Sequence, residues 1–81
     1  MEIIPLSNKQ EKYLKKYRLT KKFQKQINLL IGSPSHPSLN IEKLLPKKSG
    51  LYSFRIDKKF RAIFVTDNQV IKIVALTNHY K

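Results

Sequence analysis

Several residue types are scarce in this chain, and each shortage excludes a class of protein. The 81 residues contain no cysteine and only two glycines. Without cysteine there is neither a disulfide framework nor a thiolate metal site, and two glycines are too few for a glycine-rich phosphate loop. No apolar run approaches the roughly 18 residues that span a bilayer, and the first ten residues lack the features of a signal peptide. We therefore expect a cytoplasmic protein with no membrane association.

The short length limits the fold further. A chain of 81 residues buries roughly 60 to 65% of its unfolded surface, which gives one modest core and no deep cofactor chamber. A dinucleotide-binding fold and a TIM barrel are excluded by size. Hydrophobic residues make up 41% and charged residues 27% of the chain, which is an ordinary globular composition. We expect a single domain over residues 1–81 without a cofactor.

Acidic residues are also few. Five Asp and Glu stand against 17 Lys and Arg, so the formal net charge is +12. Such a charge attracts polyanions, of which nucleic acid is the first candidate, an acidic protein the second and an anionic membrane a distant third. The lysines crowd one N-terminal region that contains Glu11 as its only acid: Lys9, Lys12, Lys15, Lys16, Lys21, Lys22 and Lys25. This region is either a solvated face or a binding surface, and the salt dependence of binding would separate the two.

Two helices are predicted in the N-terminal half. Ser7 and Gln10 fit the capping-box pattern, and apolar residues at helical spacing predict a helix over about residues 8–17. Thr20 is placed to cap a second helix that Gly32 ends. The apolar positions are Tyr13, Leu14 and Tyr17 in the first helix, and Phe23, Ile27, Leu30 and Ile31 in the second. These stripes should face a common core.

Extended segments account for most of the remaining chain. Pro5 cannot donate to a central ladder, so the apolar N-terminus is expected to be a short edge strand. After residue 50 the hydrophobic period becomes two, and turn residues separate three further strands. The expected strands are residues 3–6, 51–56, 60–65 and 70–77, with a brief extended stretch at 39–44. We predict an α+β fold in which two helices pack on one face of a small antiparallel sheet.

Polar residues gather near the ends of the extended segments. They are Glu42, Arg55, Arg61, His79 and Tyr80. Arg55 and Arg61 flank a predicted hairpin, and a suitable register would place both on one face, where they could hold one phosphate. His36 and His79 lie far apart with few carboxylates nearby, which is a poor metal-ligand set. We therefore predict no metal site.

The remaining chemistry is cleavage of RNA through its own 2′-hydroxyl. That reaction needs a base for the hydroxyl proton, cations for the charge on the phosphate and an acid for the departing 5′-oxygen. Glu42, the two arginines and His79 are the candidates for these roles.

The segment GLYSFRIDKKFRAIFV at residues 50–65, together with the closing NHYK, resembles the RelE/ParE superfamily of type II toxin–antitoxin toxins. The similarity is greatest to the YoeB-like branch, and the order of motifs extends over nearly the whole chain. The resemblance implies a β-α-α-β-β-β fold and a small ribonuclease that cleaves mRNA in the ribosomal A site. It also implies a cognate antitoxin whose acidic segment wraps the toxin in a hetero-oligomer.

The resemblance further implies catalytic roles. Glu42 corresponds to a proposed general base, Arg61 to the transition-state arginine, and His79 to the proposed general acid. Tyr80 corresponds to the terminal aromatic that packs against the substrate base. Removing an electrostatic stabiliser costs roughly 10² to 10³ in rate, so Arg61→Ala is expected to abolish most cleavage and leave the fold intact.

Phosphate binding is where the chain departs from the family pattern. Arg55 matches a neighbouring basic position, but Leu45 stands where a lysine often follows the Glu-x-Leu motif. The nearby lysines that could substitute are Lys43, Lys47 and Lys48. Because RelE itself uses a site rich in lysine and arginine, the choice between Glu42 and a lysine as base stays open.

Two alternatives belong to other functional classes. The first is a non-catalytic inhibitor of DNA gyrase like the ParE branch, against which the His-Tyr ending argues, and a supercoiling assay would test it. The second is a degenerate module that only binds nucleic acid or a partner, which predicts that expression without an antitoxin causes no growth arrest.

Overall fold

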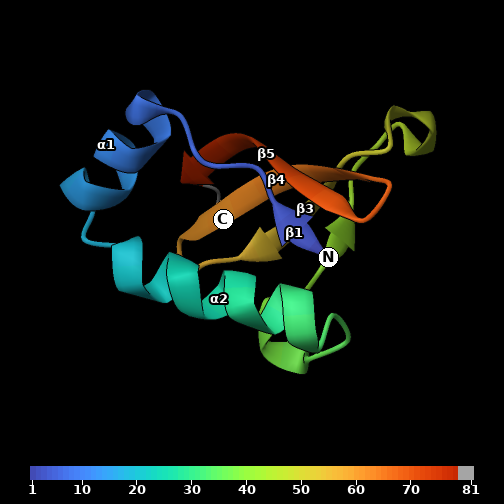
Figure 1. Cartoon of the computed structure of the whole chain (residues 1–81), viewed down its shortest axis with the longest axis horizontal. Coiled ribbons are helices and arrows are strands. Elements are labelled where there is room, and N and C mark those ends of the chain that lie inside the picture. Colours follow the sequence, from blue (N-terminus) through green and yellow to red (C-terminus); the bar gives the residue numbers. More distant parts are fainter. Residues whose placement is uncertain (79–81) are drawn as a thin grey trace.

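The structure, a computed structural model, describes residues 1–78 and confirms the predicted α+β fold (Figure 1). Two helices precede most of the sheet, and two short 3-10 turns interrupt the middle of the chain. The elements are β1 (Glu2–Ile3), α1 (Asn8–Lys16), α2 (Thr20–Gly32), η1 (Pro37–Leu39), β2 (Glu42–Lys43), η2 (Lys47–Ser49), β3 (Tyr52–Arg55), β4 (Phe60–Asp67) and β5 (Val70–Asn78).

The strands form one five-stranded sheet in the order β1-β5-β4-β3-β2. Strands β2, β3, β4 and β5 pair antiparallel with one another, as predicted, whereas β1 pairs parallel with β5. The backbone amide of Ile4 donates to the carbonyl of Ile71 at 2.9 Å in this parallel pair. The sheet is therefore mixed and not antiparallel throughout as expected. The chain passes through α1 and α2 from β1 at one edge of the sheet to β2 at the opposite edge, and a parallel pair needs such a long connection.

The capping box at the start of α1 is confirmed. The Gln10 amide donates to Ser7 Oγ at 3.1 Å, and the Ser7 amide donates to Gln10 Oε1 at 3.0 Å. The Gln10 side chain also donates to the carbonyl of Ile73 at 3.0 Å. This side chain therefore both closes the helix terminus and ties α1 to β5.

The predicted cap of α2 is wrong. Helix α2 begins at Thr20 itself, and the preceding residue, Leu19, occupies the cap position without a side-chain hydrogen bond. The cause is the end of α1, where Arg18 adopts a left-handed conformation (φ 57°) and the Leu19 amide donates to Leu14 at 2.8 Å. This pattern is a Schellman motif, and its hydrophobic contact buries Leu14 and Leu19 together. Burial of Leu19 therefore determines the start of α2, and no side-chain cap is formed there.

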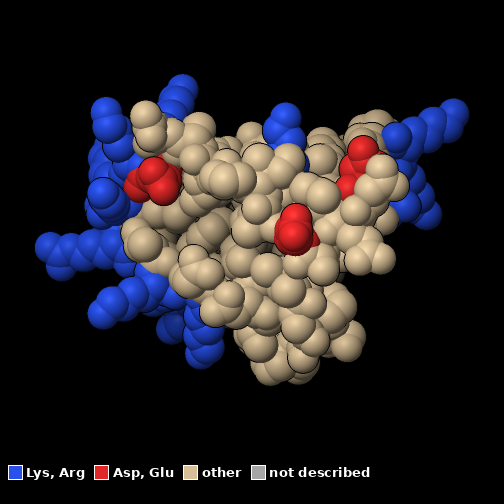
Figure 2. Space-filling view, in the orientation of Figure 1, with Lys and Arg blue, Asp and Glu red and all other residues tan. Residues whose placement is uncertain are grey.

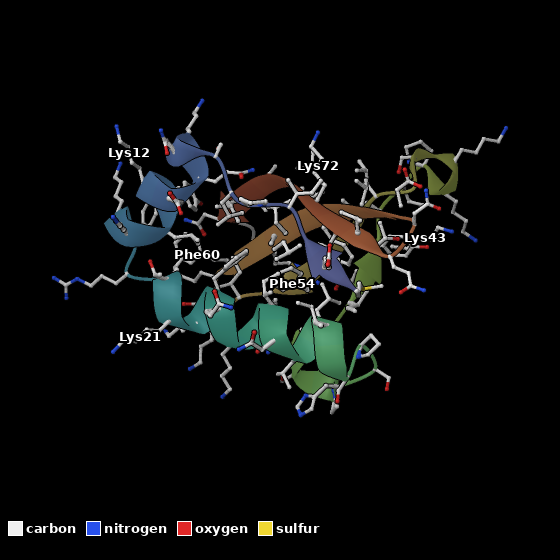
Figure 3. The ribbon with its side chains drawn as sticks, viewed as in Figure 1. Lys12, Lys21, Lys43, Phe54, Phe60 and Lys72 are labelled. Carbon is white, nitrogen blue, oxygen red and sulfur yellow. The ribbon has the colours of Figure 1, made fainter. Side chains whose placement is uncertain are left out.

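The core lies between the helices and one face of the sheet. Phe54 of β3 packs against Phe23 of α2, with ring centroids 5.9 Å apart, and lies between the sheet and that helix (Figure 3). The rest of the core comes from both layers: Leu14, Leu19, Ile27, Leu30, Leu39, Ile56, Phe60, Ala62, Phe64, Ile71 and Ile73. Of the predicted stripe residues, Tyr17 and Ile31 are instead exposed, at 41% and 37%. Neither helix within residues 1–78 has the length and apolar run that crossing a membrane requires.

Candidate functional site

The β3–β4 hairpin carries both candidate arginines. Arg55 and Arg61 are direct cross-strand partners in this antiparallel pair. Because successive side chains on a strand point to opposite faces and Phe54 faces the helices, Arg55 points to the open face of the sheet. Arg61 shares that face through its register with Arg55. The register condition on which the sequence interpretation depended is therefore met.

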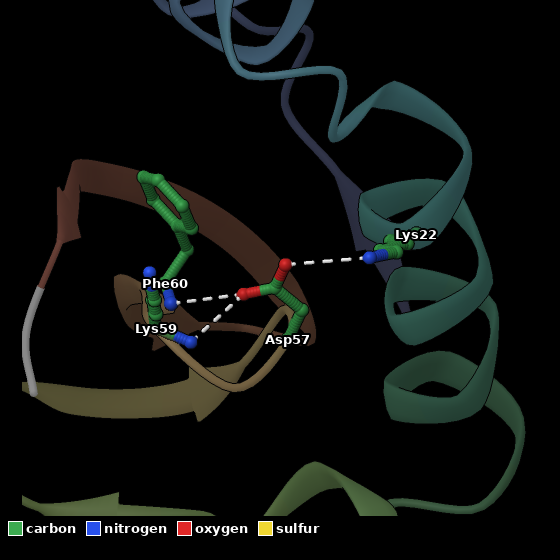
Figure 4. Close-up of polar contacts among 4 residues, drawn as sticks. All are labelled: Lys22, Asp57, Lys59 and Phe60. Atoms are coloured by element: carbon green, nitrogen blue, oxygen red, sulfur yellow. Dashed lines mark hydrogen bonds and ion pairs between the residues drawn. The ribbon is translucent and has the colours of Figure 1, made fainter.

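The turn of this hairpin is fixed by Asp57 (Figure 4). Its Oδ1 accepts hydrogen bonds from the amides of Lys59 and Phe60 at 2.9 and 3.1 Å, and its Oδ2 lies 3.4 Å from Nζ of Lys22 on α2. Burial alone would raise the pKa of Asp57, but these hydrogen bonds and the Lys22 charge together lower it below its ordinary value. Asp57 therefore holds the arginine-bearing hairpin against α2.

Glu42 joins the arginines on the open face. In the register of β2 and β3, Glu42 is the direct partner of Ser53, which lies two residues before Arg55 and so on the same side of β3. A shallow pocket of about 230 Å³ opens on this face, and its lining residues are Glu42, Leu44, Ser53, Arg61, Ile63 and Thr77. A carboxylate and a guanidinium thus line one hollow.

The Arg61 side chain is only 8% exposed and is held by hydrogen bonds. Its Nε donates to Ser53 Oγ at 2.9 Å, and its Nη2 donates to the Ser53 carbonyl at 3.3 Å and to the Asn40 carbonyl. Asn40 ends η1 in a left-handed conformation (φ 45°). Nη1 makes no hydrogen bond to the described residues, so it is the atom of this group that a ligand can use. Arg61→Ala was expected to leave the fold intact, and these contacts add that it removes a buried tie between β4, β3 and the loop before β2, which should lower stability.

Three charges influence one another at this pocket. Burial lowers the pKa of the Arg61 guanidinium, the charge of Glu42 raises it, and the charge of Arg55 lowers it again. An arginine nevertheless stays protonated at neutral pH. Arg61 forms no ion pair within residues 1–78. A cation that is partly desolvated and makes no direct ion pair with the described residues is suited to binding an anion.

The lysines proposed for phosphate binding are placed differently. Lys43 pairs with Tyr52, and its Nζ lies 5.7 Å from the centroid of that ring, so its side chain is on the opposite side of β2 from Glu42. Lys47 and Lys48 are exposed in η2, which projects from the sheet edge (Figure 1, yellow-green). Lys43 therefore does not share the face of the arginines.

The last two candidates, His79 and Tyr80, lie outside the described residues. Strand β5 ends at Asn78, and Thr77 is the cross-strand partner of Arg61. The described part of β5 therefore ends beside the pocket.

Sequence reasoning missed the residues that position the arginines. Gln26 of α2 is 6% exposed, and its Nε2 donates to the carbonyls of Ser38 and Arg55 at 3.1 and 2.8 Å. The sequence contained an indication of this role, because a glutamine within the apolar stripe of α2 must find hydrogen-bond partners when it is buried. Ser53 had a signal as well, since it alternates with Phe54 and shares the face of Arg55. No sequence pattern indicates the role of the Asn40 carbonyl, because this residue is 21 positions away from Arg61 in the chain.

The resulting site combines one carboxylate with two guanidinium groups. Within residues 1–78 no three His, Cys, Asp or Glu side chains are grouped closely enough to share a metal ion. Neighbouring guanidinium groups can hold a phosphate, and a carboxylate beside them can accept a proton. The geometry is therefore compatible with acid–base chemistry at a phosphodiester.

No protein-family model matches the sequence, and no curated protein matches it. Solved structures do match. A YoeB–YefM toxin–antitoxin heterotetramer from Staphylococcus aureus contains a chain that is 24% identical, with a TM-score of 0.72, over 98% of this chain and 94% of that one. A YoeB/ParE toxin from Agrobacterium tumefaciens is 18% identical, with a TM-score of 0.70, over 99% and 100%. YafQ from E. coli is 15% identical, with a TM-score of 0.74, over 96% and 90%. The predicted resemblance to RelE/ParE-superfamily toxins near YoeB is confirmed at the level of the fold.

Proposed function

We propose that this protein is the toxin of a type II toxin–antitoxin pair and cleaves mRNA on the ribosome without a metal ion. The observation that carries the proposal is that Glu42, Arg55 and Arg61 lie on one open face of a YoeB-like fold. A carboxylate and two guanidinium groups supply two of the three functions that cleavage through the 2′-hydroxyl requires. The third, an acid, is assigned to His79 on the basis of the sequence.

In this mechanism Glu42 accepts the proton of the 2′-hydroxyl, and the freed oxygen attacks the adjacent phosphorus. Arg61 and Arg55 stabilise the extra negative charge of the pentacoordinate phosphate. His79 donates a proton to the departing 5′-oxygen, and Tyr80 packs against a substrate base. The products are a 2′,3′-cyclic phosphate and a 5′-hydroxyl, and the cyclic ester can then hydrolyse to a 3′-phosphate.

Glu42 is a better candidate for the base than Lys43. The side chain of Lys43 lies on the other side of β2 and close to the Tyr52 ring. Lys47 and Lys48, in the projecting η2 segment, are suited to contacts with phosphates farther along the RNA. Arg61 needs little reorganisation because Ser53 and Asn40 already fix its orientation.

The proposed resting form is a hetero-oligomer with an acidic antitoxin in the cytoplasm. The net charge of +12 supports an acidic partner, and the similar YoeB chain was solved in a complex with YefM. An acidic segment that orders on binding would neutralise the toxin until the antitoxin is removed.

The test is to incubate the purified protein with translating ribosomes and to map the 5′ ends of the mRNA fragments. We expect cleavage in the A site, and a loss of cleavage of roughly 10²-fold or more in Glu42→Gln. Glu11→Gln is the matched control, because it neutralises an exposed carboxylate on α1, away from the pocket. Absence of cleavage by the wild-type protein, or full activity of Glu42→Gln, would contradict the proposal.

Gyrase inhibition is the second candidate, because the similar Agrobacterium protein carries both the YoeB and the ParE names. A supercoiling assay with purified gyrase separates the two functions. Inhibition of supercoiling without any mRNA cleavage would favour this candidate.

A further inference from the structure

Three aromatic rings form a cluster of tilted and edge-on contacts where the end of α1 meets the start of β4. The Tyr17 ring lies 4.9 Å from that of Tyr13 and 5.1 Å from that of Phe60, measured between centroids. Phe60 is 9% exposed, whereas Tyr17 is 41% exposed. Tyr17 is therefore the outer member of the cluster, and it contacts the buried Phe60 ring. We call these three residues the aromatic platform.

Cations surround this platform. Nζ of Lys16 lies 5.4 Å from the centroid of the Tyr17 ring. Lys12 and Lys21 project into solvent from α1 and α2 on the same side of the molecule, where Lys and Arg gather (Figures 2 and 3). The exposed basic residues of this region are Lys9, Lys12, Lys15, Lys16, Arg18, Lys21, Lys22 and Lys25. Glu11 is the only acidic residue between positions 8 and 32.

A hollow extends the surface along α1. A pocket of about 350 Å³ lies between α1 and β5, and Lys9, Tyr13 and Leu76 are among its lining residues. Its volume is within the roughly 300 to 1,000 Å³ of small-ligand pockets. Tyr13 belongs to both the aromatic platform and this hollow, so the hollow begins next to the platform.

We propose that the aromatic platform stacks a nucleobase of single-stranded RNA while the surrounding lysines bind its phosphates. Surfaces that bind single strands combine aromatic rings with a basic groove, because every base has a π-face and every nucleotide has a charge. An acidic peptide would also use the lysines, but the exposed ring favours RNA, because every nucleotide carries a base that can stack on it. The choice of RNA as the occupant rests on the proposed function.

The platform and the arginine site share one end of the sheet. Phe60 directly precedes Arg61 on β4, so the two side chains point to opposite faces. An RNA strand held by the arginines can continue around this end of the sheet to Tyr17. The platform would then bind nucleotides that flank the scissile bond without taking part in the chemistry.

The experiment measures binding of the full chain to a fluorescent single-stranded oligonucleotide of about ten nucleotides. The oligonucleotide is 2′-O-methyl RNA, which cannot be cleaved through its 2′-hydroxyl. Stacking contributes about 1 to 3 kcal/mol per base, so Tyr17→Ala should weaken binding roughly 5- to 150-fold. Tyr17→Phe, which keeps the ring, should bind like the wild-type protein.

Salt dependence separates stacking from charge. Lys16→Ala should reduce the slope of log K against log salt by about 0.7, the value for one phosphate contact on a single strand. Tyr17→Ala should weaken binding and leave that slope unchanged. Ile31→Ala is the matched control, because Ile31 is similarly exposed at the other end of α2, and its affinity should not change.

Several results would overturn the proposal. They are a folded Tyr17→Ala variant with wild-type affinity, a Tyr17→Phe variant as weak as Tyr17→Ala, or equal weakening in Ile31→Ala. Weaker binding of Tyr17→Ala to a polyglutamate peptide, with RNA binding unchanged, would point to an acidic protein instead. If Tyr17→Ala fails to fold, photocrosslinking of the wild-type protein to a 4-thiouridine oligonucleotide decides: a crosslink at Tyr17 supports the platform, and its absence refutes it.

The binding and crosslinking measurements require neither ribosomes nor cleavage. A protein that does not cleave mRNA but loses RNA affinity in Tyr17→Ala would retain the platform and lose the proposed function. A protein that cleaves mRNA but keeps its RNA affinity in Tyr17→Ala would support the nuclease and refute the platform.

Discussion

Replacing Arg61 by lysine tests whether the buried guanidinium holds the site together. Lysine keeps the positive charge but loses the planar fork that reaches two residues at once. In the structure this fork donates to Ser53 Oγ, to the Ser53 carbonyl and to the Asn40 carbonyl. One ammonium group cannot reproduce all three hydrogen bonds from the same position.

The size of the effect follows from the acceptors that lose their partner. A buried acceptor without a hydrogen bond costs about 1 to 3 kcal/mol. If lysine satisfies only one of the two residues, we expect the free energy of unfolding to fall by about 1 to 3 kcal/mol. For a domain of this size that corresponds to a decrease in Tm of roughly 4 to 24 °C.

Urea unfolding followed by far-UV circular dichroism measures this difference. Arg55→Lys is the matched control, because it makes the same substitution at the direct cross-strand partner, which is exposed. We expect little change in its unfolding midpoint. An Arg61→Lys midpoint equal to that of the wild type would refute the structural role derived for the fork. Cleavage by a folded Arg61→Lys variant, compared at equal folded fraction, then reports the catalytic role separately.

Three further predictions concern other parts of the fold. Because Asp57 has a lowered pKa in the folded state, its carboxylate stabilises the protein above its unfolded pKa of about 4, and this contribution is lost as the pH falls through the folded pKa. Asp57→Asn should therefore lower the free energy of unfolding at pH 7. It should also reduce the further loss of stability as the pH falls below about 4, and an unchanged pH profile would contradict this interpretation. Gln26→Leu leaves two carbonyls without a donor and should cost about 1 to 3 kcal/mol in urea unfolding, whereas exposed Gln24→Leu should cost little. Ser7→Ala removes the N-cap of α1 and should cost about 1 kcal/mol, while Ser7→Asp should restore most of that loss.

The sequence by itself determined the features that depend on near neighbours along the chain. The capping box at Ser7 and Gln10 and the two hydrophobic periods were sufficient to predict the helices and the later strands. The short turn that contains Asp57 also predicted that Arg55 and Arg61 flank a hairpin, but their register stayed open until the structure showed them as direct partners. The excess of basic residues required no structure at all.

Only the tertiary structure decided the features that depend on contacts between distant segments. Neither the parallel pairing of β1 with β5 nor the contact of Arg61 with the Asn40 carbonyl has a local signal. The same holds for the exposure of Tyr17, since an apolar spacing does not reveal where the opposing layer ends. Period and capping act over three or four residues, whereas the depth of a side chain depends on which remote segment packs over it.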